Sequence, residues 1–210
     1  MKCRICSLIL LLSLSLSAAA QSRAARGDSP RSFRLSSATF TNGETLPLSV
    51  IYNDIVNGSN ICSLNGSPGG NESPELSWTN TPRGTASFVV TLYDKTAAFT
   101  HWGMYNISPT AAGLPENAGV PDSTYGEQIL NDFEVGDQYD GPCPPNGYQP
   151  YVHHYVFTVY ALDTVLHLPS STNFPANAET LYQALIKAGK NGDILASSSI
   201  VGLYSTTPTK

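Results

Sequence analysis

The chain has 210 residues and a formal net charge of −5 at pH 7, and only 13% of its residues are Asp, Glu, Lys or Arg. An acidic chain without a cluster of Lys and Arg is not expected to bind nucleic acid or another polyanion. Its content of 17 Gly, 15 Pro and 11 Tyr is typical of a protein rich in strands and turns.

The first 20 residues have the pattern of a secretory signal peptide. Lys2 and Arg4 give a positive start, residues 8–16 form a short apolar run, and small residues end at Ala20. The apolar run is too short to span a bilayer comfortably, and no later segment is long and apolar enough to be a transmembrane helix. We therefore expect a soluble protein that is exported to the periplasm or secreted, with a flexible leader at residues 21–32.

After the leader, the sequence predicts one domain at residues 33–204 and a short tail at 205–210. The segments predicted as strands are rich in apolar and aromatic residues and cover 33–40, 75–79, 86–93, 100–107, 151–162 and 194–204. The segments predicted as loops are rich in Gly, Pro, Asn or acidic residues and cover 53–71, 109–121 and 125–139.

Three of these segments decide the expected architecture. Strands 86–93 and 151–162 are apolar on both faces, which places them at the centre of a sheet. Residues 177–190 carry apolar side chains at helical spacing, and Gly189 lies near the expected end of that helix. The prediction is a mostly β protein, an antiparallel β-sandwich with one or two peripheral helices.

Four cysteines are present, but Cys3 and Cys6 would leave with the signal peptide. Cys62 and Cys143 then remain in an oxidising compartment, where a disulfide is the natural state of two thiols that the fold brings together. Two unpaired, buried cysteines are the alternative.

Polar residues near three strand ends are the candidates for a site. Asp94 follows a buried strand, His101 lies near the start of the next, and His153 and Tyr155 share one face of the longest strand because side chains alternate along a strand. His154 points to the opposite face. The rigid turn with Pro144 and Pro145 precedes this strand.

Such a set favours the binding of an anion. A carboxylate beside an imidazole raises its pKa and fixes its tautomer, so that a protonated His pair could donate hydrogen bonds to a phosphate or carboxylate group. The Tyr155 hydroxyl could add a donor, and the prolines could contact the apolar part of a small ligand.

Other interpretations of the same residues stay open. Asp94 could cap a turn, Tyr155 could be a packed core residue, and Trp78 and Trp102 are most simply core residues. Asp94, His101 and His153 could also hold a hydrolytic metal ion, although HExxH and a nucleophile elbow are missing from the sequence and CxxC does not occur after the predicted signal peptide. Cys143 could be a nucleophile beside His153 if it were not in a disulfide.

The motifs together resemble the phosphatidylethanolamine-binding protein family, and its bacterial Raf-kinase-inhibitor-like branch in particular. The matching stretches are collinear over residues 33–204 and comprise GNESPELSW, SFVVTLYD, HWGMYNI, GPCPPNG and HHYVFTVYALD. The resemblance implies a central antiparallel sheet flanked by a smaller sheet, with helices near the C-terminus. It also implies a small anion pocket for phosphate-type head groups.

By position, the resemblance implies a pocket made by six residues: Asp94, His101, Pro144, Pro145, His153 and Tyr155. The family pattern Asp-Pro-Asp-Ala-Pro is replaced here by Asp94-Lys95-Thr96-Ala97-Ala98, which lacks the second Asp and both prolines. This loop is expected to be more flexible, and Lys95 could add a positive charge near the mouth of the pocket.

The sequence thus predicts an exported, non-catalytic protein that binds a small anionic ligand or a phospholipid head group, without a cofactor or a metal. An interaction module that inhibits or binds an unidentified protein partner is the first alternative, and a metal-dependent or Cys/His hydrolase is the second.

Overall fold

A computed structural model describes residues 32–169, 171 and 174–208 of the chain. The predicted signal peptide lies outside the described residues, as do the leader up to residue 31 and the last two residues of the predicted tail. In the part of the chain that is described, no helix has both the length and the apolar character needed to cross a bilayer.

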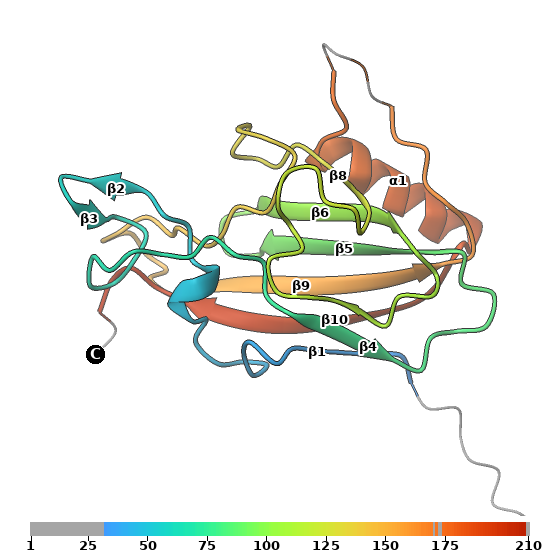
Figure 1. The fold of residues 1–210 in the computed structure, drawn as a ribbon, viewed down its shortest axis with the longest axis horizontal. Coiled ribbons are helices and arrows are strands. Elements are labelled where there is room, and N and C mark those ends of the chain that lie inside the picture. Colours follow the sequence, from blue (N-terminus) through green and yellow to red (C-terminus); the bar gives the residue numbers. More distant parts are fainter. Residues whose placement is uncertain (1–31, 170, 172–173, 209–210) are drawn as a thin grey trace, which may run out of the picture. The chain divides into compact units, whose positions relative to one another are not determined.

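The described chain is built mainly from antiparallel strands. Its elements are β1 (Arg34–Ser36), the 3-10 helix η1 (Leu48–Val50), β2 (Ile55–Val56), β3 (Ser59–Asn60), β4 (Leu76–Thr79), β5 (Ser87–Asp94), β6 (Phe99–Ile107), β7 (Gly113–Leu114), β8 (Glu127–Gln128), β9 (His153–Leu162), α1 (Ala178–Asn191) and β10 (Ile194–Tyr204). The large sheet has the order β10-β9-β5-β6-β8, a smaller sheet has the order β1-β4-β7, and β2 and β3 form a separate hairpin (Figure 1).

The main core lies between the large and the small sheet. Alternate residues of β5 and β9, among them Phe88 and Phe157, are fully buried there against Trp78 of β4 and Leu35 of β1. The two central strands pair antiparallel with each other, as their apolar pattern predicts. The predicted β-sandwich is confirmed, and Trp78 and Trp102 are core residues.

The other face of the large sheet is partly covered by α1. Leu181 and Ala188 of the helix are buried there with Val89 of β5. The helix comes so close to β6 that a Cβ atom at Gly103 would overlap the side chain of Leu181. In Figure 1, α1 is drawn near β6 and β8, and the β1–β4 pair is drawn near β10, at the other end of the strand order.

The helix is fixed at both ends by local interactions. Asn177 accepts a hydrogen bond from the backbone N–H of Thr180, whose hydroxyl accepts one from the N–H of Asn177, which is a capping box. The helix ends at Gly192, which has the left-handed conformation at φ 86°. Gly189 lies in the last turn, near the end of the helix as expected, and Gly192 is the residue that caps it.

Short elements occur where the sequence predicted loops. The β2–β3 hairpin lies inside 53–71, β7 lies inside 109–121, and β8 lies inside 125–139. Each of these four strands has only two residues, which is too few to show a periodic pattern in the sequence. The first strand, conversely, is only Arg34–Ser36 rather than 33–40.

A disulfide joins Cys62 to Cys143, whose Cα atoms are 4.4 Å apart. It connects the segment after β3 to the Pro-rich turn before β9. The alternative of two unpaired cysteines is therefore wrong, and Cys143 has no free thiol to act as a nucleophile.

Candidate functional site

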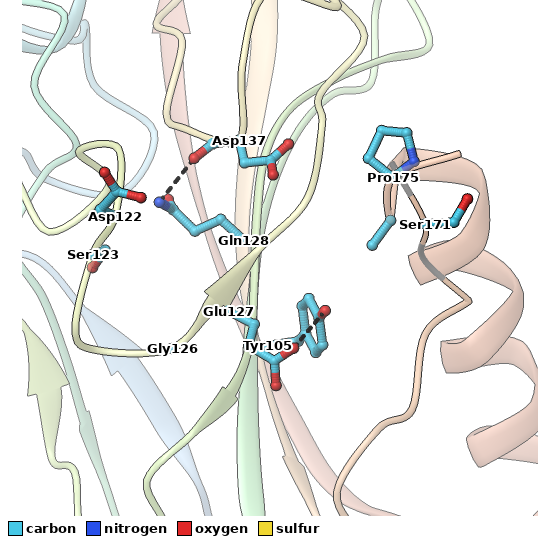
Figure 2. Close-up of a pocket in the computed structure, with 10 residues that line it drawn as sticks. Tyr105, Asp122, Ser123, Gly126, Glu127, Gln128, Asp137, Ser171 and Pro175 are labelled. Carbon is cyan, nitrogen blue, oxygen red and sulfur yellow. Dashed lines mark hydrogen bonds between the residues drawn. The ribbon is translucent and has the colours of Figure 1, made fainter. Parts of the chain in front are cut away.

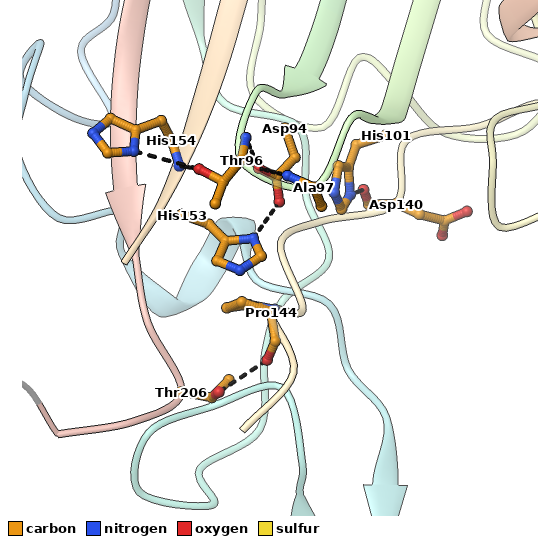
Figure 3. Close-up of polar contacts among 9 residues, drawn as sticks. All are labelled: Asp94, Thr96, Ala97, His101, Asp140, Pro144, His153, His154 and Thr206. Atoms are coloured by element: carbon orange, nitrogen blue, oxygen red, sulfur yellow. Dashed lines mark hydrogen bonds and ion pairs between the residues drawn. The ribbon is translucent and has the colours of Figure 1, made fainter. Parts of the chain in front are cut away.

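Four of the predicted site residues meet at one end of the large sheet. Asp94 ends β5, His153 lies at the start of β9, and His101 lies near the start of β6 (Figure 3). Tyr155 follows two residues after His153 in β9. All four side chains are buried, with exposed fractions from 0% for Tyr155 to 5% for His153. Because β5 and β9 are antiparallel neighbours, Asp94 pairs directly with Tyr155 across the sheet.

The Asp94 carboxylate makes contacts through both oxygens. Oδ2 lies 2.6 Å from Nδ1 of His153, and Oδ1 accepts hydrogen bonds from the backbone N–H groups of Thr96 at 2.8 Å and Ala97 at 3.1 Å. The sequence left two interpretations open for Asp94, a turn cap and a site residue. The carboxylate caps the turn and orients the His153 ring at the same time.

A β-bulge turns His101 toward this cluster. Leu92 pairs with Trp102 and Tyr93 pairs with Thr100, so His101 is an extra residue opposite β5. Strict alternation would place His101 and Trp102 on opposite faces. With the bulge, Trp102 is buried in the main core and the His101 ring also meets the buried ring of Tyr155 edge-on, with centroids 5.3 Å apart.

The protonation of His101 differs from the sequence-based expectation. Burial lowers the pKa of His101 below its ordinary value of 6.5, and the Asp140 carbonyl and the Asp94 charge oppose this only in part. The ring is therefore neutral at pH 7. Nδ1 lies 2.9 Å from the Asp140 carbonyl oxygen, which can only accept, so Nδ1 carries the proton and Nε2 is an acceptor.

The hydroxyl of Tyr155 is the unsatisfied group of the cluster. It is buried and makes no hydrogen bond of normal geometry among the described residues, although the carboxylate of Asp94 lies close enough to act on its pKa. Burial, followed by the charge of Asp94, raises the pKa of Tyr155, so the hydroxyl keeps its proton and can donate. A buried hydroxyl without a partner costs free energy unless a ligand or a water completes it.

The two prolines of the turn have different surroundings. Pro144 is buried, and its carbonyl accepts a hydrogen bond from the Thr206 hydroxyl at 2.9 Å, whereas Pro145 is exposed. In Figure 3, Pro144 lies beyond the edge of the His153 ring that faces away from Asp94. The turn begins at Gly141, where a Cβ atom would overlap the carbonyl oxygen of Val50.

Two neighbouring residues do not belong to the cluster. His154 is exposed and points the opposite way from His153, as predicted, and its Nδ1 lies 3.4 Å from Oγ1 of Thr96. Lys95 does not lie at the mouth of the cluster, as the sequence suggested, but lines a cavity on the α1 face of the large sheet. Lys95 follows Asp94 directly, so alternation turns its side chain to the other face.

A buried polar network that the sequence did not reveal supports His101. The carboxylate of Asp140 is fully buried and accepts hydrogen bonds from the amide groups of Asn71, Asn131 and Gln138. Asn71 in turn accepts one from the backbone N–H of Gly141 at 2.7 Å. The network fixes the segment whose carbonyl oxygen contacts His101, but in sequence Asp140 is one more acid in a segment predicted to be irregular.

Aromatic rings form a second feature that the sequence did not reveal. The ring of Phe133 contacts His101 edge-on with centroids 5.3 Å apart and Tyr52 face to face at 5.0 Å, and Phe99 contacts both His101 and Phe133. These rings are only half-buried. They give the cluster an apolar wall on the His101 side.

Two cavities lie outside this cluster. One, of about 450 Å³, is lined by acidic and polar groups, including Glu127 and Asp137 (Figure 2). There the Tyr105 hydroxyl donates to Glu127, Gln128 donates to the Asp137 carbonyl oxygen, and burial raises the pKa of Asp137. The other lies beside α1. Within the described residues, no group of three or more His, Cys, Asp or Glu side chains could hold a metal ion.

The sequence matches the family model described as phosphatidylethanolamine-binding protein over residues 36–205. The chain belongs to the phosphatidylethanolamine-binding protein family. This confirms the family that the sequence motifs indicated.

Curated relatives and solved structures agree with this assignment. UPF0098 protein YbcL of Escherichia coli is 34% identical over 180 residues, which are 82% of this chain and 87% of the relative. A UPF0098 protein of Aquifex aeolicus is 36% identical over 162 residues, 75% of this chain and 88% of the relative. UPF0098 protein YbhB of E. coli is 36% identical over 140 residues, 62% of this chain and 78% of the relative.

The crystal structure of E. coli YbcL, described as a new member of the mammalian PEBP family, is similar with a TM-score of 0.66 and 32% identity. The match covers 83% of this chain and 99% of that chain. A homologue of the family from Chlamydia trachomatis is similar with a TM-score of 0.58 and 28% identity, covering 83% and 97% of the two chains.

Proposed function

We propose that the cluster of Asp94, His101, His153 and Tyr155 binds a small phosphate-type anion or a phospholipid head group without catalysing a reaction. The observation that carries the proposal is the Tyr155 hydroxyl, a buried donor with no partner among the described residues. It lies beside two imidazoles whose Nδ1 atoms are engaged by Asp94 and by the Asp140 carbonyl. The Nε2 atoms of both rings have no protein partner among the described residues, so they are available to a ligand.

The protonation states favour a phosphate group that carries a proton. Tyr155 offers a hydroxyl hydrogen to a phosphate oxygen, while the neutral His101 offers Nε2 as an acceptor for a P–OH group. His153 is oriented by the carboxylate of Asp94 and can donate from Nε2 when it is protonated. Pro144 and the ring of Phe133 supply apolar contacts for the remainder of a ligand.

The family name and the YbcL structure support the same ligand class, since they associate this fold with phosphatidylethanolamine. The decisive experiment is an NMR titration of the protein with inorganic phosphate and with O-phosphoethanolamine. We expect the imidazole resonances of His101 and His153 to shift, and His101→Ala to weaken binding at least tenfold. His154→Ala, on the opposite face, is the matched control and should bind like the natural protein. Unmoved resonances of both rings would refute the proposal.

A protein partner is the second candidate function, and the surface around the β2–β3 hairpin favours it. Ile55, Val56, Ile61 and Leu64 are each between 44% and 52% exposed. Such apolar side chains gathered on one segment mark interaction surfaces. If the protein binds a partner through this surface, the double variant Ile55→Ser with Leu64→Ser abolishes partner binding. The single variant His101→Ala leaves partner binding intact.

We also propose that the protein is exported after cleavage near Ala20. The support is the charged start, the short apolar run and the small residues before the cleavage point. N-terminal sequencing of protein from its own host should begin near residue 21. A mature protein that begins at Met1 would contradict export through this signal.

A further inference from the structure

The cavity beside α1 has the size of a small-molecule site. Its volume is about 770 Å³, within the usual range of roughly 300–1,000 Å³ for ligand pockets. The walls are the first half of α1 and the face of β5 and β9 opposite to the Asp94 cluster. None of the six predicted site residues lines it.

The lining combines aromatic rings with hydroxyl groups. Tyr93 of β5 and Tyr182 of α1 line the cavity and remain 40% and 58% exposed. Thr91, Thr158 and Tyr160 of the sheet line the same cavity. Large rings that stay half in water beside polar hydroxyls offer flat surfaces on which a ligand with both apolar and polar sides can pack.

The charges of the lining have both signs. Lys95 supplies a cation that takes part in no ion pair among the described residues, whose single ion pair is His153–Asp94. Asp132 and Glu179 supply carboxylates, each using one oxygen to accept a hydrogen bond within the chain, from the Thr100 N–H at 2.6 Å and from the Gln183 amide at 2.8 Å. Their other oxygens have no protein donor in the part of the chain that is described.

Mixed charges select against a simple ion. An anion would meet two carboxylates and a cation would meet Lys95, so each would be repelled by part of the wall. A neutral polyol avoids this conflict, because every hydroxyl both donates to a carboxylate and accepts from an ammonium group. A sugar ring also has an apolar face of C–H groups that can pack on a tyrosine.

We propose that this cavity is a saccharide-binding site, with Tyr93 and Tyr182 packing against the sugar and Lys95, Asp132 and Glu179 binding its hydroxyl groups.

The same turn borders this cavity and the Asp94 cluster. This turn is residues 95–98. Its residues Lys95 and Ala98 line the cavity. Its residues Thr96 and Ala97 donate their backbone N–H groups to the carboxylate of Asp94. Ala98 has φ 54°, a left-handed conformation that a residue with a side chain seldom adopts. A sugar that contacts Lys95 and Ala98 therefore alters the turn that orients Asp94 and, through it, His153. This coupling, unlike the sugar site itself, rests on the proposed anion function.

Four disaccharides, cellobiose, maltose, lactose and N,N′-diacetylchitobiose, can be tested at millimolar concentration. Saturation-transfer NMR detects the bound sugar, and amide shifts in the protein locate it. We expect at least one sugar to bind and to shift the amides of Thr91, Tyr93 and Thr158. Tyr93→Ala and Tyr182→Ala should each weaken binding about three- to tenfold, the loss expected from one ring contact.

Tyr125→Ala is the matched control, because Tyr125 is 46% exposed and does not line the cavity. We expect Lys95→Gln to weaken sugar binding. Its matched control is Lys187→Gln on α1, which removes the same charge at a position outside the cavity lining. No binding by any of the four sugars overturns the proposal, as does equal binding by Tyr93→Ala, Tyr182→Ala and Tyr125→Ala. Tryptophan that binds in place of the sugars would also overturn it and would indicate a zwitterion site.

The coupling is measured by repeating the phosphate titration with the sugar at saturation. We expect the phosphate affinity to change at least threefold, with shifts of the Thr96 and Ala97 amides. An unchanged affinity overturns the coupling alone. If phosphate fails to bind without sugar, the proposed anion function fails, and the sugar titration still tests the cavity.

Discussion

The carboxylate of Asp94 holds the ring of His153 at 2.6 Å with one oxygen and closes its own turn with the other. One side chain thus links the conformation of the segment after β5 to the orientation of the first residue of β9. Thr96 adds a second link, because its hydroxyl accepts the backbone N–H of His154 at 3.0 Å. The segment that departs from the family pattern is therefore held to the sheet by side-chain bonds rather than by prolines.

Substitution of Asp94 should separate its two roles. In Asp94→Asn the amide oxygen can still accept the N–H groups of Thr96 and Ala97, but the charge opposite His153 is lost. We expect Asp94→Ala to lower the free energy of unfolding by about 3–5 kcal/mol and Asp94→Asn by roughly half as much. Urea denaturation measures both, and equal losses would show that the turn bonds contribute nothing.

Removal of the Tyr155 hydroxyl should stabilise the fold and weaken the site. Tyr155→Phe relieves a buried donor without a partner, so the free energy of unfolding should rise by about 1 kcal/mol. Phosphate affinity should fall in the same variant. Tyr105→Phe is the matched comparison, because that hydroxyl donates to Glu127 at 2.9 Å and its loss should cost about 1 kcal/mol. A destabilised Tyr155→Phe would mean that the hydroxyl has a partner in solution.

Anion binding should depend on the protonation of His101. Burial lowers the pKa of His101 in the folded protein. Between this lowered pKa and the ordinary value of 6.5, the unfolded chain therefore binds more protons than the folded chain. The free energy of unfolding then decreases as the pH is lowered through 6.5. A bound anion favours the protonated His101 ring and therefore opposes this decrease in stability. Sulfate, whose charge is constant from about pH 5 to 8, should therefore bind up to about tenfold more tightly per pH unit as the pH falls.

Calorimetric titration of sulfate at several pH values measures this effect. His101→Gln should remove the part of the pH dependence that belongs to His101, and His154→Ala should retain it. Sulfate affinity that does not vary with pH would contradict the assignment of Nε2 of His101 to the anion.

The buried Asp140 network should determine the tautomer of His101. Asp140→Ala leaves the amides of Asn71, Asn131 and Gln138 without their common acceptor, and we expect a loss of about 2–4 kcal/mol in the free energy of unfolding. The specific readout is the ¹⁵N shift of the His101 ring, which should change from protonated Nδ1 to a mixture of tautomers. Asp137→Ala, at an exposed position nearby, should leave the ring unchanged.

The disulfide should contribute substantially to stability. It closes a long loop, since 81 positions separate Cys62 from Cys143, and the chain-entropy model gives about 4.5 kcal/mol for a loop of this length. Urea denaturation of the double variant Cys62→Ser with Cys143→Ser measures the loss. Thiol labelling of the unreduced protein should modify neither cysteine, and labelling of both would contradict the pairing.

The sequence by itself determined the family, the strands β5, β6, β9 and β10, the helix α1 and the residues of the cluster. Long strands and a capped helix carry their pattern locally, and alternation along β9 was enough to turn His153 and Tyr155 one way and His154 the other. Two-residue strands such as β7 and β8 carry no such pattern, so they became visible only through pairing with distant strands.

Only the tertiary structure decided how the cluster works. The bulge that turns His101, the carbonyl of Asp140 that fixes its tautomer and the burial that keeps it neutral all depend on segments far apart in the chain. The same holds for the Tyr155 hydroxyl, which packing removes from water and leaves without a partner among the described residues. Protonation and hydrogen-bond satisfaction are set by the surroundings of a residue in space, and the order of residues along the chain does not specify those surroundings.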